Sequence, residues 1–250
     1  MSTYSLLQVS LDQAIERSSM EDASDAISSI ARIDCAYLQR DLFGMVVSGL
    51  PLDEALAFQA ELERRGFPTK VVADDQLPVL HEPFTIQRID ITDDALQFTD
   101  AMGRLQTRTM NDLVFIAGGF LQRHKIVSEL IMGTGLAPRG AFGTREPSRP
   151  EREPHEEVIL EFRLDFFFAT APNRIRASVS ATNVVFFRGL PMQLRDTALI
   201  IGAMLDFQEL LPAERLGEGL KRLDTQTAYP SLHSYEEEIR WHFYQLQAHR

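Results

Sequence analysis

The segment 43–72 restricts the fold of this chain more than any other stretch, because it predicts a strand, a helix and a second strand with clear boundaries. Alternating residues over 43–48 predict a mostly buried strand. Pro51 suits the first turn of a helix, where its missing N–H needs no partner. Gly66 supplies the left-handed residue that commonly ends a helix, and 67–72 is typical of a returning strand.

The loop that precedes this helix, Gly49-Leu50-Pro51, invites comparison with a phosphate-binding loop. Pro51 has no N–H to offer a phosphate, and Asp53 and Glu54 in the first turn would repel an anion. We therefore interpret the loop as a folding signal without chemistry of its own. Helical periodicity predicts an apolar stripe at Leu52, Ala55, Phe58 and Leu62.

The first 78 residues predict one small α+β domain around this segment. Further strands are expected at Tyr4–Val9 and Ala36–Leu38, and apolar residues between Ala23 and Ala31 have helical spacing. The predicted order is β-α-β-β-α-β, which over 4–73 resembles the small ferredoxin-like modules found as accessory or regulatory pieces of bacterial proteins. The general layout of the chain is also similar to bacterial proteins of uncharacterised function.

The segment Asp74–Pro83 predicts a linker, because it contains two prolines, begins with two aspartates and has no periodicity. We place the boundary between two domains there. The second domain then comprises residues 84–250.

The second domain is expected to be β-rich. Its predicted strands surround an irregular insertion at 133–157, which we interpret as a solvated segment, with a functional loop as the alternative. A helix at Leu194–Leu210 follows, so the order fits a pleckstrin-homology-like (PH-like) roll, with a generic α+β sandwich as the alternative. The predicted strands are 84–91, 95–98, 104–109, 113–121, 158–169, 174–180 and 183–188.

Two adjacent glycines, Gly118 and Gly119, interrupt the predicted strand 113–121. Glycine inside a strand indicates a bulge or a close approach of another segment to the backbone. A phosphate-binding role is disfavoured, because neither a Gly-x-Gly-x-x-Gly pattern nor a following Lys-Ser/Thr is present.

Charge and cysteine content restrict the classes of function. The formal charge of −11 disfavours binding to nucleic acid and to anionic membranes, since both need positive surface charge. The single Cys35 excludes an internal disulfide and any multi-cysteine metal site. The N-terminus lacks a basic start followed by an apolar run, so a cytoplasmic protein is expected. No cofactor or metal is predicted.

A search for catalytic motifs assigns no catalytic residue. The patterns Gly-x-Ser-x-Gly and His-Glu-x-x-His are absent, and Cys35 has only Arg32 as a basic neighbour in the sequence. The last helix is predicted to start at Ser234, with Glu237 completing a capping box. The candidate pocket or interaction residues are Tyr229, His233, Tyr235, Trp241, His242 and Tyr244.

These observations lead to three hypotheses about function. The first is a non-enzymatic cytoplasmic protein that acts through protein–protein contacts as a regulatory, scaffolding or oligomer-forming component. The second is a small-molecule-binding protein or enzyme with a pocket between the two domains, lined by the linker and the last helix. The third is a homo-oligomer formed by pairing of free sheet edges in the first domain.

Overall fold

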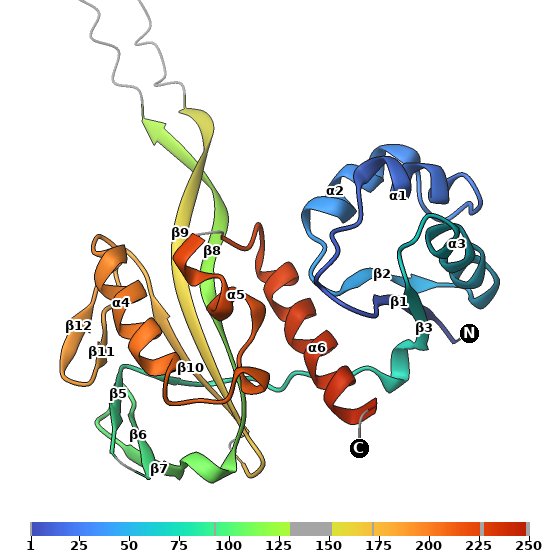
Figure 1. Ribbon diagram of the computed structural model, residues 1–250. Helices are drawn as coiled ribbons and strands as arrows, with labels where there is room; N and C mark the ends of the chain where they lie inside the picture. Colours follow the sequence, from blue (N-terminus) through green and yellow to red (C-terminus); the bar gives the residue numbers. More distant parts are fainter. Residues whose placement is uncertain (1, 93, 131–151, 172, 226–227, 249–250) are drawn as a thin grey trace, which may run out of the picture.

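The computed structural model describes residues 2–248 apart from 93, 131–151, 172 and 226–227. The described residues form an α+β structure with three β-sheets and six α-helices. Figure 1 shows an N-terminal lobe, a larger β-rich part and a long C-terminal helix that lies between them.

The N-terminal lobe is a three-stranded antiparallel sheet with strand order β2-β1-β3. Leu6 on the central strand faces an apolar core shared with the helices, whereas the next residue, Leu7, faces the opposite side of the sheet. The elements are β1 (Tyr4–Gln8), α1 (Arg17–Ser24), α2 (Cys35–Arg40), β2 (Met45–Leu50), α3 (Leu52–Arg64) and β3 (Thr69–Ala73).

The expected strand at Ala36–Leu38 is wrong, because these residues lie in helix α2. Cys35 and Leu38, three residues apart, face the same core, which is helical and not strand spacing. The predicted β-α-β-β-α-β order is therefore not formed in this half of the lobe. Helix α1 also ends at Ser24, before most of the apolar residues that had predicted it.

The segment 43–72 folds largely as predicted. Helix α3 covers Leu52–Arg64, Pro51 occupies the position just before it, and Gly66 has a positive φ of 86°. Ala55, Phe58 and Leu62 of the predicted stripe are buried, while Leu52 remains exposed. The sequence was sufficient to predict the ends of helix α3, because Pro51 and Gly66 each affect the backbone only within one turn of themselves.

The β-rich part contains a four-stranded sheet of order β4-β10-β9-β8 and a five-stranded sheet of order β12-β11-β5-β6-β7. Phe98 and Phe166 meet edge to face between the sheets, and Met204 of helix α4 (Thr197–Gln208) adds to the same core. The strands are β4 (Phe84–Ile86), β5 (Arg88–Ile91), β6 (Ala95–Thr99), β7 (Leu105–Thr109), β8 (Leu113–Leu130), β9 (Arg152–Phe168), β10 (Arg174–Val179), β11 (Val185–Phe187) and β12 (Leu190–Met192).

Strands β8 and β9 form a hairpin that extends well beyond the sheets (Figure 1). Its ladder continues to the pair Leu130–Arg152, so residues 152–157 of the predicted insertion belong to a strand. Residues 133–151 of that prediction lie outside the described residues. Continuous backbone pairing, and not apolar patterning, extends the strands in this region.

The C-terminal segment contains α5 (Glu218–Lys221) and α6 (Leu232–Ala248) and runs along β8. The N–H of Gly217 donates to Ile116 O at 2.8 Å, and the N–H of Tyr229 donates to Phe120 O at 2.7 Å. Ser231 Oγ accepts from the N–H of Ser234 at 3.1 Å, so Ser231 caps α6 and the predicted cap at Ser234 is wrong.

The double glycine in β8 marks a close approach, as one of its two interpretations predicted. A Cβ on Gly119 would lie 2.8 Å from Tyr229 Cε2, and the ladder with β9 has no register shift at this point. Gly219 of α5 packs against the same strand, where a Cβ would lie 2.5 Å from Gly118 O. Glycine is needed at 119 because the Tyr229 ring lies against it, and at 219 because the Gly118 carbonyl and the Tyr229 hydroxyl lie against it.

We expect Gly219→Ala to lower the free energy of unfolding by about 1–3 kcal/mol, because its methyl group would overlap the β8 backbone. Gly202→Ala is the matched control, since Gly202 also lies in a helix but a Cβ there meets nothing within 4 Å. That variant should raise the stability by up to about 1 kcal/mol. Urea unfolding followed by circular dichroism measures both, and equal effects would contradict the close-approach interpretation.

Candidate functional site

Helix α6 contacts both parts of the molecule (Figure 1). One side of the helix, with Tyr235 and Ile239, packs on β8 and β9. Another side, with Trp241 and Tyr244, packs on the N-terminal sheet. The predicted site residues on this helix are therefore distributed over several surroundings.

Trp241 and Tyr244, two of the candidate pocket or interaction residues, pack against the N-terminal lobe. Trp241 Nε1 donates to Gln8 O at 2.7 Å, and its ring lies against Gly44, where a Cβ would overlap it. Lys70 Nζ lies 5.0 Å from the centre of the Tyr244 ring. Both aromatic side chains thus join the last helix to the first sheet.

Tyr229 and Tyr235 are buried side by side, with perpendicular rings 5.2 Å apart. Tyr229 donates to Glu238 Oε2 at 2.5 Å, and Tyr235 donates to Asp165 Oδ2 at 2.9 Å. Burial and the neighbouring carboxylates raise the pKa of both phenols well above the usual value. Both therefore remain protonated hydrogen-bond donors at neutral pH.

Asp165 is the centre of a buried charge network beneath α6. Arg176 Nε donates to Asp165 Oδ1 at 2.8 Å, and Arg174 Nη2 donates to Oδ2 at 3.1 Å and to Glu236 at 3.2 Å. Burial alone would raise the pKa of Asp165, but the hydrogen bond from Arg176 and the two positive charges hold it below the usual value. Asp165 is therefore an ionised structural carboxylate.

Glu161, Arg163 and Asp165 alternate along β9 and so share one face of that strand, and this face is covered. All three side chains are buried. The alternation of residues along a strand predicts which side chains share a face. It does not predict which element covers that face, because that element can lie far away in the sequence. Arg174 and Arg176 were the available sequence signal that this face is covered, since they provide positive charge on the adjacent strand β10.

The two histidines among the predicted residues are separated. His242 stacks on Phe115 with ring centres 3.9 Å apart, and burial lowers its pKa to about 4, so it is neutral at pH 7. His233 is exposed and lies 2.8 Å from Glu237 through its Nε2 atom. His233 alone of the six predicted residues lines the cleft described next.

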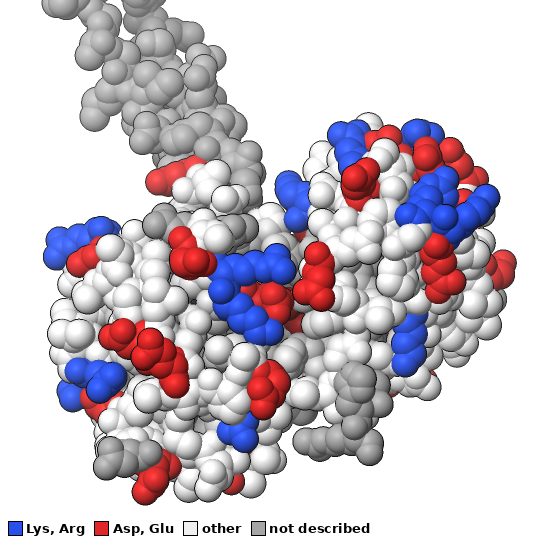
Figure 2. Space-filling model, in the orientation of Figure 1, with Lys and Arg blue, Asp and Glu red and all other residues white. Residues whose placement is uncertain are grey.

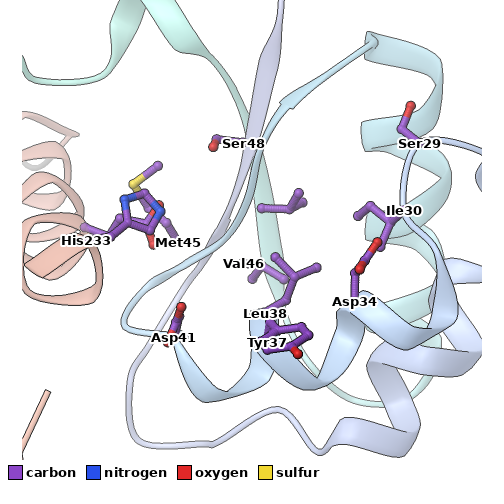
Figure 3. Close-up of a pocket in the computed structure, with 12 residues that line it drawn as sticks. Ser29, Ile30, Asp34, Tyr37, Leu38, Asp41, Met45, Val46, Ser48 and His233 are labelled. Atoms are coloured by element: carbon purple, nitrogen blue, oxygen red, sulfur yellow. The ribbon is translucent and has the colours of Figure 1, made fainter. Parts of the chain in front are cut away.

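A cleft of about 320 Å³ separates the start of α6 from the N-terminal lobe. Figure 3 shows His233 of α6 on one side, Met45 beside it, and Asp34 and Tyr37 on the opposite side. The lining residues are Ser29, Ile30, Asp34, Tyr37, Leu38, Asp41, Met45, Val46, Val47, Ser48, His233 and Glu237. Most of them precede α6 by almost 200 positions, so no local sequence pattern places them in one cleft with His233.

Three carboxyl groups line the cleft. Asp41 pairs with Arg40 at 2.9 Å, whereas the carboxylate of Asp34 has no polar partner among the described residues. Burial raises the pKa of Glu237 to about 7; Arg240 opposes this increase and Asp41 adds to it. The cleft therefore combines negative charge with apolar walls.

Comparison of the chain with protein-family models, with curated proteins and with solved structures returns no match. Within the part of the chain that the structure describes, no helix is both long enough and apolar enough to cross a membrane. No group of three or more His, Cys, Asp or Glu side chains in that same part is arranged to hold a metal ion.

We expect Glu237→Gln to stabilise the protein at alkaline pH. A carboxyl group whose pKa rises from 4.5 to about 7 on folding contributes stability below pH 4.5 that is lost as the pH rises through 7. The variant should gain about 1–3 kcal/mol over the wild type between pH 5 and pH 8.5.

Urea unfolding at a series of pH values measures this difference. Glu82→Gln, on an exposed linker residue, is the control and should leave the pH profile of stability unchanged. A Glu237→Gln profile parallel to the wild type would show that Glu237 ionises equally in the folded and unfolded chains.

We expect Trp241→Phe to lower the free energy of unfolding by about 1–2 kcal/mol, because the variant loses the hydrogen bond to Gln8 O and part of the buried ring. Tyr244→Phe is the matched control, since it keeps the ring that faces Lys70. It should change the stability by less than about 0.5 kcal/mol. Denaturant unfolding followed by circular dichroism compares the two variants, and equal losses would contradict the assigned role of Trp241.

Proposed function

We propose that this chain is a non-enzymatic cytoplasmic protein that acts through protein–protein contacts, and that its cleft receives a partner segment carrying a lysine or arginine. The observation that carries the proposal is the exposed Asp34 carboxylate, which has no side-chain partner among the described residues and lies in a cleft that Leu38 and Met45 also line. A cationic side chain with an aliphatic stem matches both features.

The surroundings of the cleft support a protein partner. Tyr37 and Ile33, beside Asp34, are 61% and 74% exposed. Exposed aromatic and aliphatic side chains next to complementary charge are typical of the central part of a protein interface. A partner could place the stem of its lysine or arginine against Leu38 and Met45 while the charge meets Asp34.

The polar groups of the cleft support binding and not catalysis. His233 is paired with Glu237, and neither Ser29 nor Ser48 is hydrogen-bonded to His233 in the part of the chain that the structure describes. A nucleophile activated by a base would need such a contact. The cleft therefore presents charge and shape without an activated group.

Surface charge supports a protein in preference to nucleic acid as the partner. On the face that Figure 2 shows, basic side chains lie beside acidic ones. Arg32 pairs with Asp22 and Asp25, and Arg65 pairs with Glu61. Paired charges leave little positive potential for a phosphate backbone.

The division into domains 1–78 and 84–250 is part of the same proposal. Separate apolar clusters support it, one within residues 4–71 and the other within 84–228. Two packed sheets with α4 against their shared core support the PH-like resemblance of the second domain, with a generic α+β sandwich as the alternative. Self-association through the sheet edges at β2 or β3 is a second form of protein contact.

The test is affinity purification of the tagged full-length chain from its native cells, followed by mass spectrometry. We expect a recurrent protein partner that Asp34→Lys reduces at least about tenfold, because like charge in the cleft opposes the incoming cation. Asp75→Lys is the matched control, since Asp75 is exposed and lies outside the cleft.

Equal recovery with both variants would place the partner elsewhere on the surface. Light scattering after size exclusion separates self-association from binding to another protein. A monomer that recovers no partner would contradict the proposal.

A further inference from the structure

Helix α4 carries apolar side chains on almost every side, although it lies on the outside of the β-rich part (Figure 1). Ile200 and Phe207 face the core. Ala198, Gly202 and Leu205 form an outer stripe on the opposite side of the helix; all three are exposed, Leu205 by 41%. A helix that is apolar all round is normally buried, so the outer stripe lacks a cover among the described residues.

Unpaired charges of opposite sign lie at the two ends of the outer stripe. Arg195 lies just before α4, and Asp206 and Glu209 lie at its end. All three side chains are exposed, and none of them forms an ion pair or a side-chain hydrogen bond within the part of the chain that the structure describes. The stripe therefore runs from one positive end to one negative end.

This order of charges is the reverse of the one that stabilises an isolated helix. The helix dipole favours negative side chains near the first turn and positive ones near the last turn. Asp196 meets this preference by accepting from the N–H of Leu199 at 3.1 Å, but Arg195 and the acidic end do not. An antiparallel neighbour corrects this, because it brings its negative end to Arg195 and its positive end to Glu209.

The two ends of α4 also differ in shape. A hollow of about 530 Å³ lies at the start of the helix, where Arg195 lines it together with the apolar residues Leu160, Ala181, Val184 and Leu194. At the other end Leu210, next to Glu209, is 52% exposed. One end therefore offers a largely apolar hollow beside a positive charge, and the other end offers an apolar side chain beside negative charges.

The two ends match each other, so the occupant that fits this surface is a second copy of the chain. Gly202 lies seven residues after Arg195 and seven before Glu209. In an antiparallel pair of helices that cross at Gly202, each Arg195 meets Glu209 of the other copy, whereas a parallel pair would bring like charges together. Gly202 suits the crossing, because a Cβ there meets nothing within 4 Å in its own chain and small residues let two helix axes approach to about 8 Å.

We propose that this chain forms a homodimer in which α4 packs antiparallel on α4 of a second copy. Gly202 lies near the twofold axis, Arg195 pairs with Glu209 of the other copy, and Leu210 enters the hollow of the other copy. This interface goes beyond the proposed function, because α4 belongs neither to the cleft that holds Asp34 nor to the sheet edges at β2 and β3.

Analytical ultracentrifugation of the full-length chain measures the association. We expect a monomer–dimer dissociation constant of about 1–100 μM, as suits a small interface. Leu205→Lys places a charge in the stripe and should raise that constant at least about tenfold. Leu105→Lys is the matched control and should leave it unchanged, since Leu105 is 60% exposed but lies on β7, at the edge of the five-stranded sheet opposite to β12.

Exchange of the two charges tests the antiparallel arrangement. Arg195→Glu and Glu209→Arg should each raise the dissociation constant at least about fivefold, because each brings like charges together across the interface. The double variant should return to within about twofold of the wild type, and so should an equimolar mixture of the two single variants, since both restore opposite charges at each contact. Circular dichroism confirms that the variants are folded.

A chain that stays monomeric up to the highest soluble concentration would overturn the proposal as a whole. Equal effects of Leu205→Lys and Leu105→Lys would overturn the location on α4. A double variant that associates as weakly as the single ones would overturn the antiparallel pairing. Asp34→Lys should leave the dimer intact, so the dimer and the binding role of the cleft can fail separately.

Discussion

The ionised Asp165 beneath α6 is the constraint on which the arrangement of the two parts depends. A buried carboxylate without partners would be strongly destabilising, and here Arg174, Arg176 and Tyr235 satisfy it. Because Tyr235 belongs to α6, the network fixes that helix on the four-stranded sheet. Trp241, further along the same helix, then holds the N-terminal lobe through Gln8.

Two cavities follow from this position of α6. Its first turns form one wall of the acidic cleft, where His233 and Glu237 lie opposite Asp34. Its last turns form one wall of another cavity, of about 230 Å³, which Phe243 and Leu80 of the linker both line. Each cavity needs the helix and a surface distant from it in the chain. A shift of the helix would therefore change both.

The sequence predicted the features whose causes are local. Pro51 and Gly66 mark the two ends of helix α3, because each restricts or frees its own backbone. Gly118-Gly119 marked a contact that only glycine allows. Ala36–Leu38 was misassigned, because three residues cannot distinguish strand from helical spacing without knowledge of which face is buried. His233 marked the α6 side of the cleft in the sequence, but Asp34 lies far away in the chain and belongs to no motif.

The order in which these surfaces emerge during synthesis is a further consequence of placing α6 last among the described elements. The apolar face at Leu7, Met45 and Val72 and the charged face around Asp165 are both made long before residues 232–248. Domains tend to fold as they leave the ribosome, N-terminal parts first. The nascent chain must therefore carry two uncovered faces of opposite character until one helix covers both at once.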